Sequence, residues 1–172
     1  MAFPVIPTGF ISSGSPSPYK IPLSLRFDSQ VADYLYDTPQ REGNRKKWTW
    51  SGWVKRNSLG NQWIYTCSTD YTNGYGGYIF FSSDQDTFGY WDLRQGSYSW
   101  ISQSRASYRD TSAWYHLIVA VDYEQVTPSE RCILYTNGIR NDLNTSNPPL
   151  TAELSTINSI RPHFFNHPTA SN

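Results

Sequence analysis

Residues 48–55 read Trp-Thr-Trp-Ser-Gly-Trp-Val-Lys, with a large apolar side chain at nearly every second position. A period of two is the pattern of a β-strand, because successive side chains of a strand point to opposite faces of the sheet. We expect a buried face that carries Trp48, Trp50, Gly52 and Val54. The other face carries Thr49, Ser51, Trp53 and Lys55. Gly52 leaves a gap in the buried face, which a large opposing ring is expected to fill.

Two further stretches show the same alternation. Residues 114–122 read Trp-Tyr-His-Leu-Ile-Val-Ala-Val-Asp, and both of their faces are fairly apolar, which predicts a strand in the middle of a sheet. Residues 133–140 predict a hairpin, because Asn137-Gly138 accepts the positive φ that both central positions of a type I′ turn require.

Shorter alternating runs occupy much of the remaining chain. The expected strands are residues 23–27, 34–36, 62–66, 77–82, 88–94 and 98–103. The breaks between them contain Asn-Gly, Gly-Gly, Ser-Asp and Gly-Ser, which are turn sequences. No segment keeps the helical period of 3.6 residues, so the sequence predicts an all-β domain.

The composition limits the class of function. The chain has 172 residues, which is enough for one domain with a substantial core. Its 14 basic and 14 acidic residues cancel, which argues against general electrostatic binding to nucleic acid or to an anionic membrane. No run approaches the roughly 20 apolar residues of a membrane span, so we expect no membrane insertion.

The chain has two cysteines, Cys67 and Cys132, and each lies in a strand-like run. A disulfide between them would require the two strands to face each other. We expect buried free thiols instead, because a protein made in a reducing cytoplasm seldom keeps a disulfide.

Residues 1–22 are expected to form an extended arm that precedes a domain at residues 23–172. Prolines at positions 4, 7, 16, 18 and 22 disfavour both helix and strand pairing, and the segment lacks the basic start and apolar run of a secretory signal. One interpretation is a disordered tail. The other is an arm that docks on a neighbouring subunit through the apolar anchors Phe3, Val5, Ile6, Phe10 and Ile11.

Four blocks of the sequence resemble the laminin G-like, or concanavalin A-like, domain family. They are Leu25-Arg26-Phe27-Asp28, the runs at 48–55 and 114–122, and Leu134-Tyr135-Thr136-Asn137-Gly138. Their common order makes the resemblance far more specific than any one block. It implies a two-sheet antiparallel jelly-roll sandwich.

A narrower resemblance concerns structural proteins of tailed phages, notably marine and cyanobacterial ones. It rests on Ser-Leu-Arg-Phe at 24–27 and on Gly-Asn-Arg-Lys-Lys-Trp-Thr-Trp-Ser-Gly-Trp-Val-Lys at 43–55. Such domains sit in tail fibres or on the outside of the particle. The resemblance therefore implies a virion protein, made in the host cytoplasm, whose partners are capsid or tail proteins.

The resemblance has a gap near the end of the domain. Family members usually continue, after a segment like residues 157–165, into a Phe-Asp-Gly-containing strand that closes the sandwich, and this sequence does not show one. Either another subunit donates the final strand, or Phe164-Phe165 supplies a shorter closure. An open sheet edge favours assembly, so we expect a homo-oligomer.

Aromatic side chains crowd the middle of the chain beside polar ones. Rings with one wet face stack on sugars, while neighbouring polar groups bind the sugar hydroxyls. The candidate glycan-binding residues are Tyr71, Tyr75, Trp91, Arg94 and Trp100. For each of them, burial in the core or in a subunit interface is the alternative.

Catalysis by paired carboxylates is the enzymatic alternative, because some sandwiches of this shape hydrolyse glycans. The sequence Glu-x-Asp-x-x-Glu, typical of those enzymes, does not occur. Asp84 and Asp86 are paired acids, but they lie between turn residues, where a solvated loop is expected. His116 is expected to be structural, because no cysteine or acid accompanies it at metal-ligand spacing. We therefore predict no catalytic residue.

Calcium is an open alternative in a chain for which we otherwise predict no cofactor. Laminin G-like domains often hold calcium at the rim through Asp and Asn oxygens, the ligands that hard cations prefer. By position, the candidates are Asp70 with Asn73, and Asp122 with Asn141 or Asp142. Loops rich in Asp and Asn are also ordinary turns.

The sequence thus predicts a non-enzymatic virion structural protein, a tail-fibre or particle-surface module for adhesion or decoration. It would assemble through residues 1–22 and display the loops of the sandwich to host surface glycans. The alternatives are a stand-alone carbohydrate-binding lectin-type module and a glycan hydrolase of the same fold.

Overall fold

The computed structural model describes residues 23–27, 33–68, 76–94, 97–146 and 153–166. The arm at residues 1–22 lies outside these ranges, so its docking role stays a prediction, as do the roles of its anchors Phe3, Val5, Ile6, Phe10 and Ile11. Within the described ranges the chain forms strands, loops and one 3-10 helix at Pro128–Glu130. No described helix is long and apolar enough to cross a membrane.

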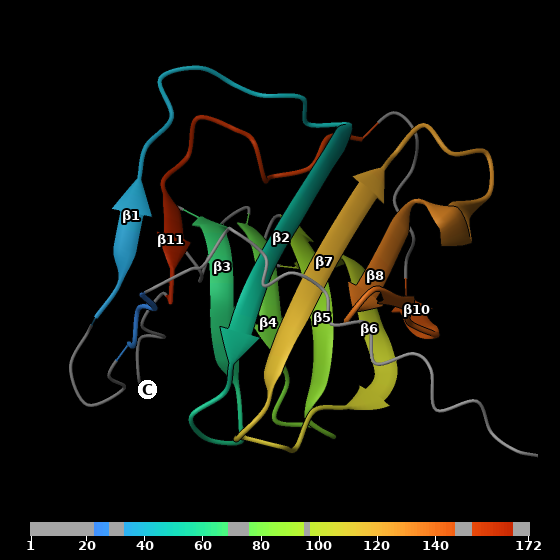
Figure 1. Cartoon of the computed structure of the whole chain (residues 1–172). Helices are drawn as coiled ribbons and strands as arrows, with labels where there is room; N and C mark the ends of the chain where they lie inside the picture. Colours follow the sequence, from blue (N-terminus) through green and yellow to red (C-terminus); the bar gives the residue numbers. More distant parts are fainter. Residues whose placement is uncertain (1–22, 28–32, 69–75, 95–96, 147–152, 167–172) are drawn as a thin grey trace, which may run out of the picture.

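Two antiparallel sheets pack face to face (Figure 1). The seven-stranded sheet has the order β1-β11-β3-β4-β5-β6-β10. Its strands are β1 (Leu35–Asp37), β3 (Gln62–Ser68), β4 (Gly76–Phe81), β5 (Thr87–Arg94), β6 (Ser97–Ser107), β10 (Leu143–Ser146) and β11 (His163–Phe165). The four-stranded sheet consists, in order, of β2 (Lys47–Lys55), β7 (Trp114–Asp122), β8 (Cys132–Thr136) and β9 (Ile139–Arg140). The predicted all-β, two-sheet antiparallel jelly-roll sandwich is confirmed.

The four-stranded sheet follows the alternation of its sequence closely. Buried and half-buried residues of β2 alternate with exposed ones, starting from buried Trp48. β7 lies between β2 and β8, as its two fairly apolar faces predict. Asn137 and Gly138 have φ values of 51° and 81°, so the hairpin between β8 and β9 turns where expected.

The core lies between the two sheets and is rich in aromatic rings. Trp48 of β2 meets Tyr90 of β5 edge to face, with ring centroids 5.2 Å apart. Edge-to-face contacts suit the opposite charges of ring faces and ring edges. The core cluster also contains Ile79, Phe81, Phe88, Trp100, Leu117, Val119, Tyr123 and Leu134.

The gap at Gly52 is filled from its own strand and not from the opposing sheet. A Cβ atom placed on Gly52 would lie 3.2 Å from the ring of Trp50, two residues earlier. The Trp50 ring therefore lies over the glycine and also approaches Tyr65 of β3, with centroids 6.5 Å apart.

Residues 23–27 do not form the predicted strand. Leu23 and Leu25 are 82% and 70% exposed. A strand needs a partner for its backbone groups, and an alternating pattern alone does not supply one. The expected strand at 34–36 is present with its bounds shifted by one residue, as β1.

Closure of the seven-stranded sheet comes from the chain itself. β11 pairs with both β1 and β3, which places Phe164 opposite Tyr36 on one side and Thr66 on the other. Of the two alternatives for closure, the short strand at Phe164-Phe165 is therefore the one present in this sheet.

Both cysteines are buried free thiols, as predicted. Burial raises the pKa of Cys67 to about 11 and that of Cys132 to about 12. Because Cys67 lies in β3 and Cys132 in β8, the two thiols belong to different sheets.

Candidate functional site

The face of the four-stranded sheet that points away from the core, here called the outer face, combines aromatic and polar side chains. The pairing of β2 with β7 places side by side Thr49 and Ala120, Ser51 and Ile118, and Trp53 and His116. Trp53 is 58% exposed, and its ring stacks on His116 with centroids 5.1 Å apart and planes inclined by 31°. The stack holds the indole in place while much of it faces solvent, which suits an apolar sugar face.

An open pocket of about 520 Å³ lies at one end of the outer face. It is lined by Lys47, Trp48, Thr49, Ala120, Val121, Asp122, Gln125, Glu130 and Ile133. On the outer face, Thr49, Ala120 and Ile133 contribute small or apolar side chains, while Trp48 and Val121 belong to the core cluster. The strand ends, the loop after β7 and the 3-10 helix contribute charged and amide groups. This volume lies within the range of small-molecule sites, and the mixture of surfaces suits a ligand with both hydroxyls and C–H faces.

Ion pairs fix the charged groups of the pocket. Lys47 Nζ lies 2.9 Å from Glu124 Oε2 and 3.5 Å from Asp122 Oδ2. The hydrogen bond to Glu124 and the charges of both carboxylates raise the pKa of Lys47. Arg140 Nη2 donates to both carboxylate oxygens of Glu130, at 2.7 and 2.8 Å. These exposed pairs contribute little stability, but they orient the side chains at the rim.

Asp122 organises the turn that follows β7. Its Oδ1 accepts a hydrogen bond from the Glu124 backbone N–H at 3.0 Å, and its Oδ2 accepts one from Gln125 Nε2 at 2.8 Å. Partial burial opposes ionisation, but these hydrogen bonds and the charge of Lys47 outweigh it and lower the pKa of Asp122. Arg131 Nε donates to the Gln125 carbonyl oxygen at 2.9 Å, which fixes the turn from its other end.

The charges around the pocket nearly balance. The carboxylates of Asp122, Glu124 and Glu130 face the cations of Lys47 and Arg140. Neither a polyanion nor a polycation finds a strong electrostatic attraction in such a set. The chemistry therefore favours a neutral ligand that exchanges hydrogen bonds with fixed polar groups.

The predicted glycan-binding residues do not gather at this pocket. Tyr71 and Tyr75 lie outside the described residues, as does the side chain of Arg94 at the end of β5. Trp91 is half-buried in the seven-stranded sheet, where its ring lies 4.0 Å from the centroid of Phe80. The two predicted glycan-binding residues whose side chains are described, Trp91 and Trp100, therefore lie in the seven-stranded sheet and not on the outer face.

The assignment of Trp100 to glycan binding is corrected by its burial. Trp100 is 1% exposed and meets Tyr90 and Tyr123 edge to face, at centroid distances of 5.1 and 5.4 Å. Its Nε1 donates to Ser102 Oγ at 3.0 Å. Since its ring packs against two other rings and its polar atom is hydrogen-bonded inside the sandwich, Trp100 is a core residue.

A second aromatic cluster lies on the other side of the seven-stranded sheet. Tyr78 and Phe80 of β4 belong to it, whereas Ile79 and Phe81 belong to the core, as the alternation of a strand requires. Trp63 joins it with its ring centroid 5.2 Å from that of Tyr78. Because these three rings are all buried, they offer no exposed platform comparable to Trp53.

The proposed calcium pairing of Asp122 with Asn141 or Asp142 is wrong. Asn141 Nδ2 donates to Thr136 Oγ1 at 3.0 Å, and Thr136 pairs with Leu117. Leu117 precedes Asp122 by five residues in β7, which is about 17 Å along a strand. Among the described residues, no group of three His, Cys, Asp or Glu side chains is arranged to hold a metal ion. The other candidate pair lies outside those residues: Asp70 and Asn73.

Asp92 is a carboxylate enclosed between the sheets. It is 1% exposed and accepts hydrogen bonds from the hydroxyls of Tyr90, Tyr123 and Thr156, at 3.0, 2.9 and 2.8 Å. Burial and the neighbouring Asp92 charge raise the pKa of Tyr90 well above its ordinary value, so its hydroxyl stays a donor. Asp92 thus holds the loop that contains Thr156 against the core. Because Asp92 itself is buried, a glycan cannot reach its carboxylate.

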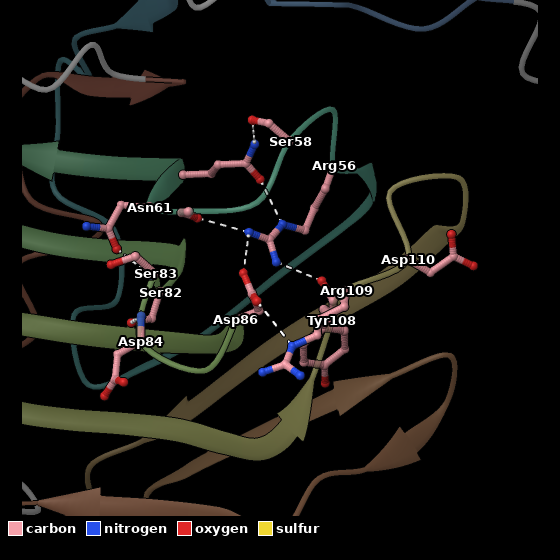
Figure 2. A network of polar contacts seen from close by, with 12 residues as sticks. Arg56, Ser58, Asn61, Ser82, Ser83, Asp84, Asp86, Tyr108, Arg109 and Asp110 are labelled. Atoms are coloured by element: carbon pink, nitrogen blue, oxygen red, sulfur yellow. Dashed lines mark hydrogen bonds and ion pairs between the residues drawn. The ribbon is translucent and has the colours of Figure 1, made fainter.

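The two acids of the β4–β5 turn have different roles at one end of the sandwich. Figure 2 shows Asp86 directed at the buried guanidinium of Arg56, with Arg56 Nη2 3.2 Å from Asp86 Oδ1. Burial of Asp86 opposes ionisation, but the Arg56 charge and further hydrogen bonds outweigh it and lower the pKa of Asp86. Asp84 is exposed, and its backbone N–H donates to Ser82 Oγ at 3.1 Å. Asp86 is accordingly held as an ion-pair partner of Arg56.

Sequence reasoning placed Trp53 on the outward side of β2 but did not recognise the pocket. The pocket combines the start of β2 with the end of β7 and with Gln125 and Glu130, which are far from β2 in the sequence. The sequence did contain one indication of the pocket: Lys47 and Asp122 carry opposite charges and lie at the ends of two expected strands. Only the register of those strands shows that the charges meet.

Comparison with known proteins supports the fold. Residues 30–163 match the family model Laminin_G_3, described as the concanavalin A-like lectin/glucanases superfamily. The matched range includes all four strands of the outer face and the whole pocket. No curated protein and no solved structure matches the chain.

Proposed function

Because the chain belongs to the concanavalin A-like lectin/glucanase superfamily, we propose that it is a non-enzymatic adhesion module whose outer face binds glycans. The fold of this superfamily allows carbohydrate binding. The observation that carries the proposal is the continuity of the outer face, where β2 leads from the pocket at Lys47 and Thr49 to the exposed ring of Trp53.

The dimensions of the outer face favour an oligosaccharide over a single sugar. Thr49 lines the pocket, and Trp53 follows it by four residues, which corresponds to about 14 Å along β2. A ligand that uses both features must extend along the strand. The near balance of charge at the pocket favours neutral sugar units there.

We place this activity on the surface of a tailed-phage particle, in a tail fibre or a decoration protein. The support is the resemblance of residues 24–27 and 43–55 to structural proteins of such phages. In this setting residues 1–22 dock the chain on capsid or tail proteins, and the outer face is displayed to glycans of the host. A stand-alone lectin-type module is the alternative, which would bind the same ligands without joining a particle.

Three observations support binding without hydrolysis. Asp92 is enclosed in the core, and Asp86 is held by Arg56. Asp122 is committed to Lys47 and to the turn after β7, with a lowered pKa that disfavours a role as general acid.

A glycan array with bacterial surface oligosaccharides, neutral and acidic, tests the proposal. We expect the wild-type chain to bind neutral members and Trp53→Ala to lose tenfold or more in affinity, because a central aromatic contact typically contributes about 1.4 kcal/mol or more. Tyr36→Ala is the matched control, because Tyr36 is 68% exposed in the opposite sheet. Equal losses in both variants, or no binding at all, would contradict a site on the outer face.

Two further measurements separate the alternatives. Chromatography of each bound glycan after prolonged incubation should show no shortened product, and a product would identify a hydrolase. Deletion of residues 1–22 should prevent incorporation into particles while glycan binding persists. A truncated chain that joins particles normally would contradict the docking role of the arm.

A further inference from the structure

The four-stranded sheet has an open edge at β2. The Lys46 carbonyl oxygen accepts a hydrogen bond from the Tyr123 N–H at 2.9 Å, so even-numbered residues of β2 turn their backbone groups toward β7. The backbone groups of Thr49, Ser51 and Trp53 then point to the opposite side. Within residues 23–27, 33–68, 76–94, 97–146 and 153–166, no strand pairs with that side.

The seven-stranded sheet extends beyond this edge. Its three additional strands make it about 14 Å wider than the four-stranded sheet. Trp50 of β2 lies near Tyr65 of β3, so the edge strand β2 lies over β3. β11 and β1 follow β3 in the seven-stranded sheet and therefore extend beyond the β2 edge (Figure 1). On the side that faces the core, these two strands present Phe165 and Leu35, which are 41% and 48% exposed.

The open edge therefore borders an incompletely covered apolar surface. Trp50 and Val54 on the inner side of β2 are only half-buried, although both pack against the core. A strand added beside β2 would pair with the backbone groups of Thr49, Ser51 and Trp53. Every second side chain of that strand would point toward Trp50, Phe165 and Leu35, so the strand must carry large apolar residues with a period of two.

Residues 23–27 meet this requirement. They read Leu-Ser-Leu-Arg-Phe, with Leu23, Leu25 and Phe27 on one side and Ser24 and Arg26 on the other. In the single chain they form no strand, and the two leucines are among its more exposed apolar side chains. Residues 23–27 of one copy of the chain could therefore pair with the edge of β2 in another copy.

We propose that the free edge of β2 accepts residues 23–27 of a second copy of the chain, so that two copies complete each other's four-stranded sheets. Reciprocal exchange uses the same two surfaces on both copies and closes as a dimer. Leu23, Leu25 and Phe27 cover the overhanging apolar surface, and Ser24 and Arg26 extend the outer face beside Ser51 and Trp53. The proposal is independent of glycan binding.

Light scattering after size-exclusion chromatography tests the exchange on the full chain. The wild type should show twice the chain mass of 19.8 kDa. Leu25→Asp places a charge on the buried side of the added strand and should weaken association tenfold or more. Ser24→Asp introduces the same charge on the outer side and should leave the dimer intact.

A proline variant tests the accepting edge. Ser51→Pro removes an N–H that faces the open edge and leaves the pairing with β7 in place, so it should give a folded monomer. Circular dichroism and the thermal midpoint check the fold, and Thr49→Pro replaces this variant if it does not fold. Ser51→Pro mixed with Leu25→Asp should form a heterodimer, because the first chain keeps an intact segment and the second an intact edge.

The remaining outcomes overturn the proposal. A monomeric wild type shows that no second copy supplies the strand. Equal effects of Ser24→Asp and Leu25→Asp, or a mixture that stays monomeric, show that the segment and the edge do not meet in the proposed way. Deletion of residues 1–22 should leave the dimer intact, and a monomeric truncated chain would assign the contact to the arm instead.

Discussion

At the scale of single residues, Arg56 shows how one buried charge joins separate loops. Its Nη1 donates to the Tyr108 carbonyl oxygen at 2.7 Å, its Nη2 donates to the Gly60 carbonyl oxygen at 2.9 Å, and its Nε donates to Gln62 Oε1 at 3.0 Å. The guanidinium also lies over the Phe81 ring, 4.6 Å from the centroid. Together with its ion pair to Asp86 in the β4–β5 turn, these contacts let one side chain link three loops at this end of the sandwich (Figure 2).

Replacement of Arg56 should therefore cost far more stability than replacement of a neighbouring arginine. We expect Arg56→Met to lower the free energy of unfolding by about 3–5 kcal/mol, because it leaves the Asp86 carboxylate without its buried partner. Arg109→Met is the control, since Arg109 contacts the same carboxylate from a side chain that is 67% exposed, and it should cost about 1 kcal/mol or less. Urea titrations of both variants measure the difference, and similar losses would contradict the assigned role of Arg56.

The two thiols give a second residue-scale prediction. With pKa values of about 11 and 12, Cys67 and Cys132 carry little thiolate at pH 8, and burial blocks access to them. A disulfide reagent such as Ellman's should therefore release almost no chromophore from the native protein and two equivalents after unfolding in denaturant. Rapid reaction of the native protein at pH 8 would show that one of these strands opens.

Sequence patterns predicted which residues of a strand are buried better than they predicted polar partners. The buried face of 48–55 follows from alternation alone, and the central position of 114–122 follows from its two fairly apolar faces; the structure confirms both predictions. Arg56 and Asp92 were not recognised, because their partners come from loops distant in sequence. Trp100 was assigned to a ligand because composition does not distinguish a core ring from a surface ring.

At the scale of elements, the β8–β9 hairpin depends on backbone conformation more than on packing. Gly138 has a φ of 81°, and no heavy atom of the described residues lies within 4 Å of the position that a Cβ would occupy. Gly138→Ala should therefore lower the free energy of unfolding by about 1–2 kcal/mol through backbone strain alone. Gly138→Asn, which tolerates this conformation, should lose less, and equal losses measured by thermal unfolding would contradict this explanation.

Strand prediction succeeded for segments that find a strand partner within the described part of the chain and failed for residues 23–27, which do not. β8 and β9 are joined by a two-residue turn, so their pairing follows from local sequence, whereas β2 and β7 pair although they are far apart in the chain. Residues 23–27 have an equally clear alternation, yet they remain without a strand partner in the single chain. Strand pairing depends on both segments, so the alternating pattern of one segment does not predict whether it will pair.

At the scale of the whole molecule, the two sheets differ in width and in character. The seven-stranded sheet buries aromatic rings on both of its sides, whereas the four-stranded sheet buries one side and exposes Trp53 and Trp114 on the other. The architecture was predictable from the sequence as two antiparallel sheets. The unequal widths were not, because they depend on which segments pair across the molecule, and both the outer-face site and the open edge follow from them.

Backbone amide mapping by heteronuclear NMR tests the central claim, that the outer face of the four-stranded sheet is the glycan-binding surface. The probe is the tightest-binding neutral oligosaccharide from the array, titrated into the isotope-labelled full chain. We expect the largest shift changes at the amides of Thr49, Ser51 and Ala120 and at the Trp53 indole. Changes centred on Trp91 and the other strands of the seven-stranded sheet, with the outer face unaffected, would contradict the account.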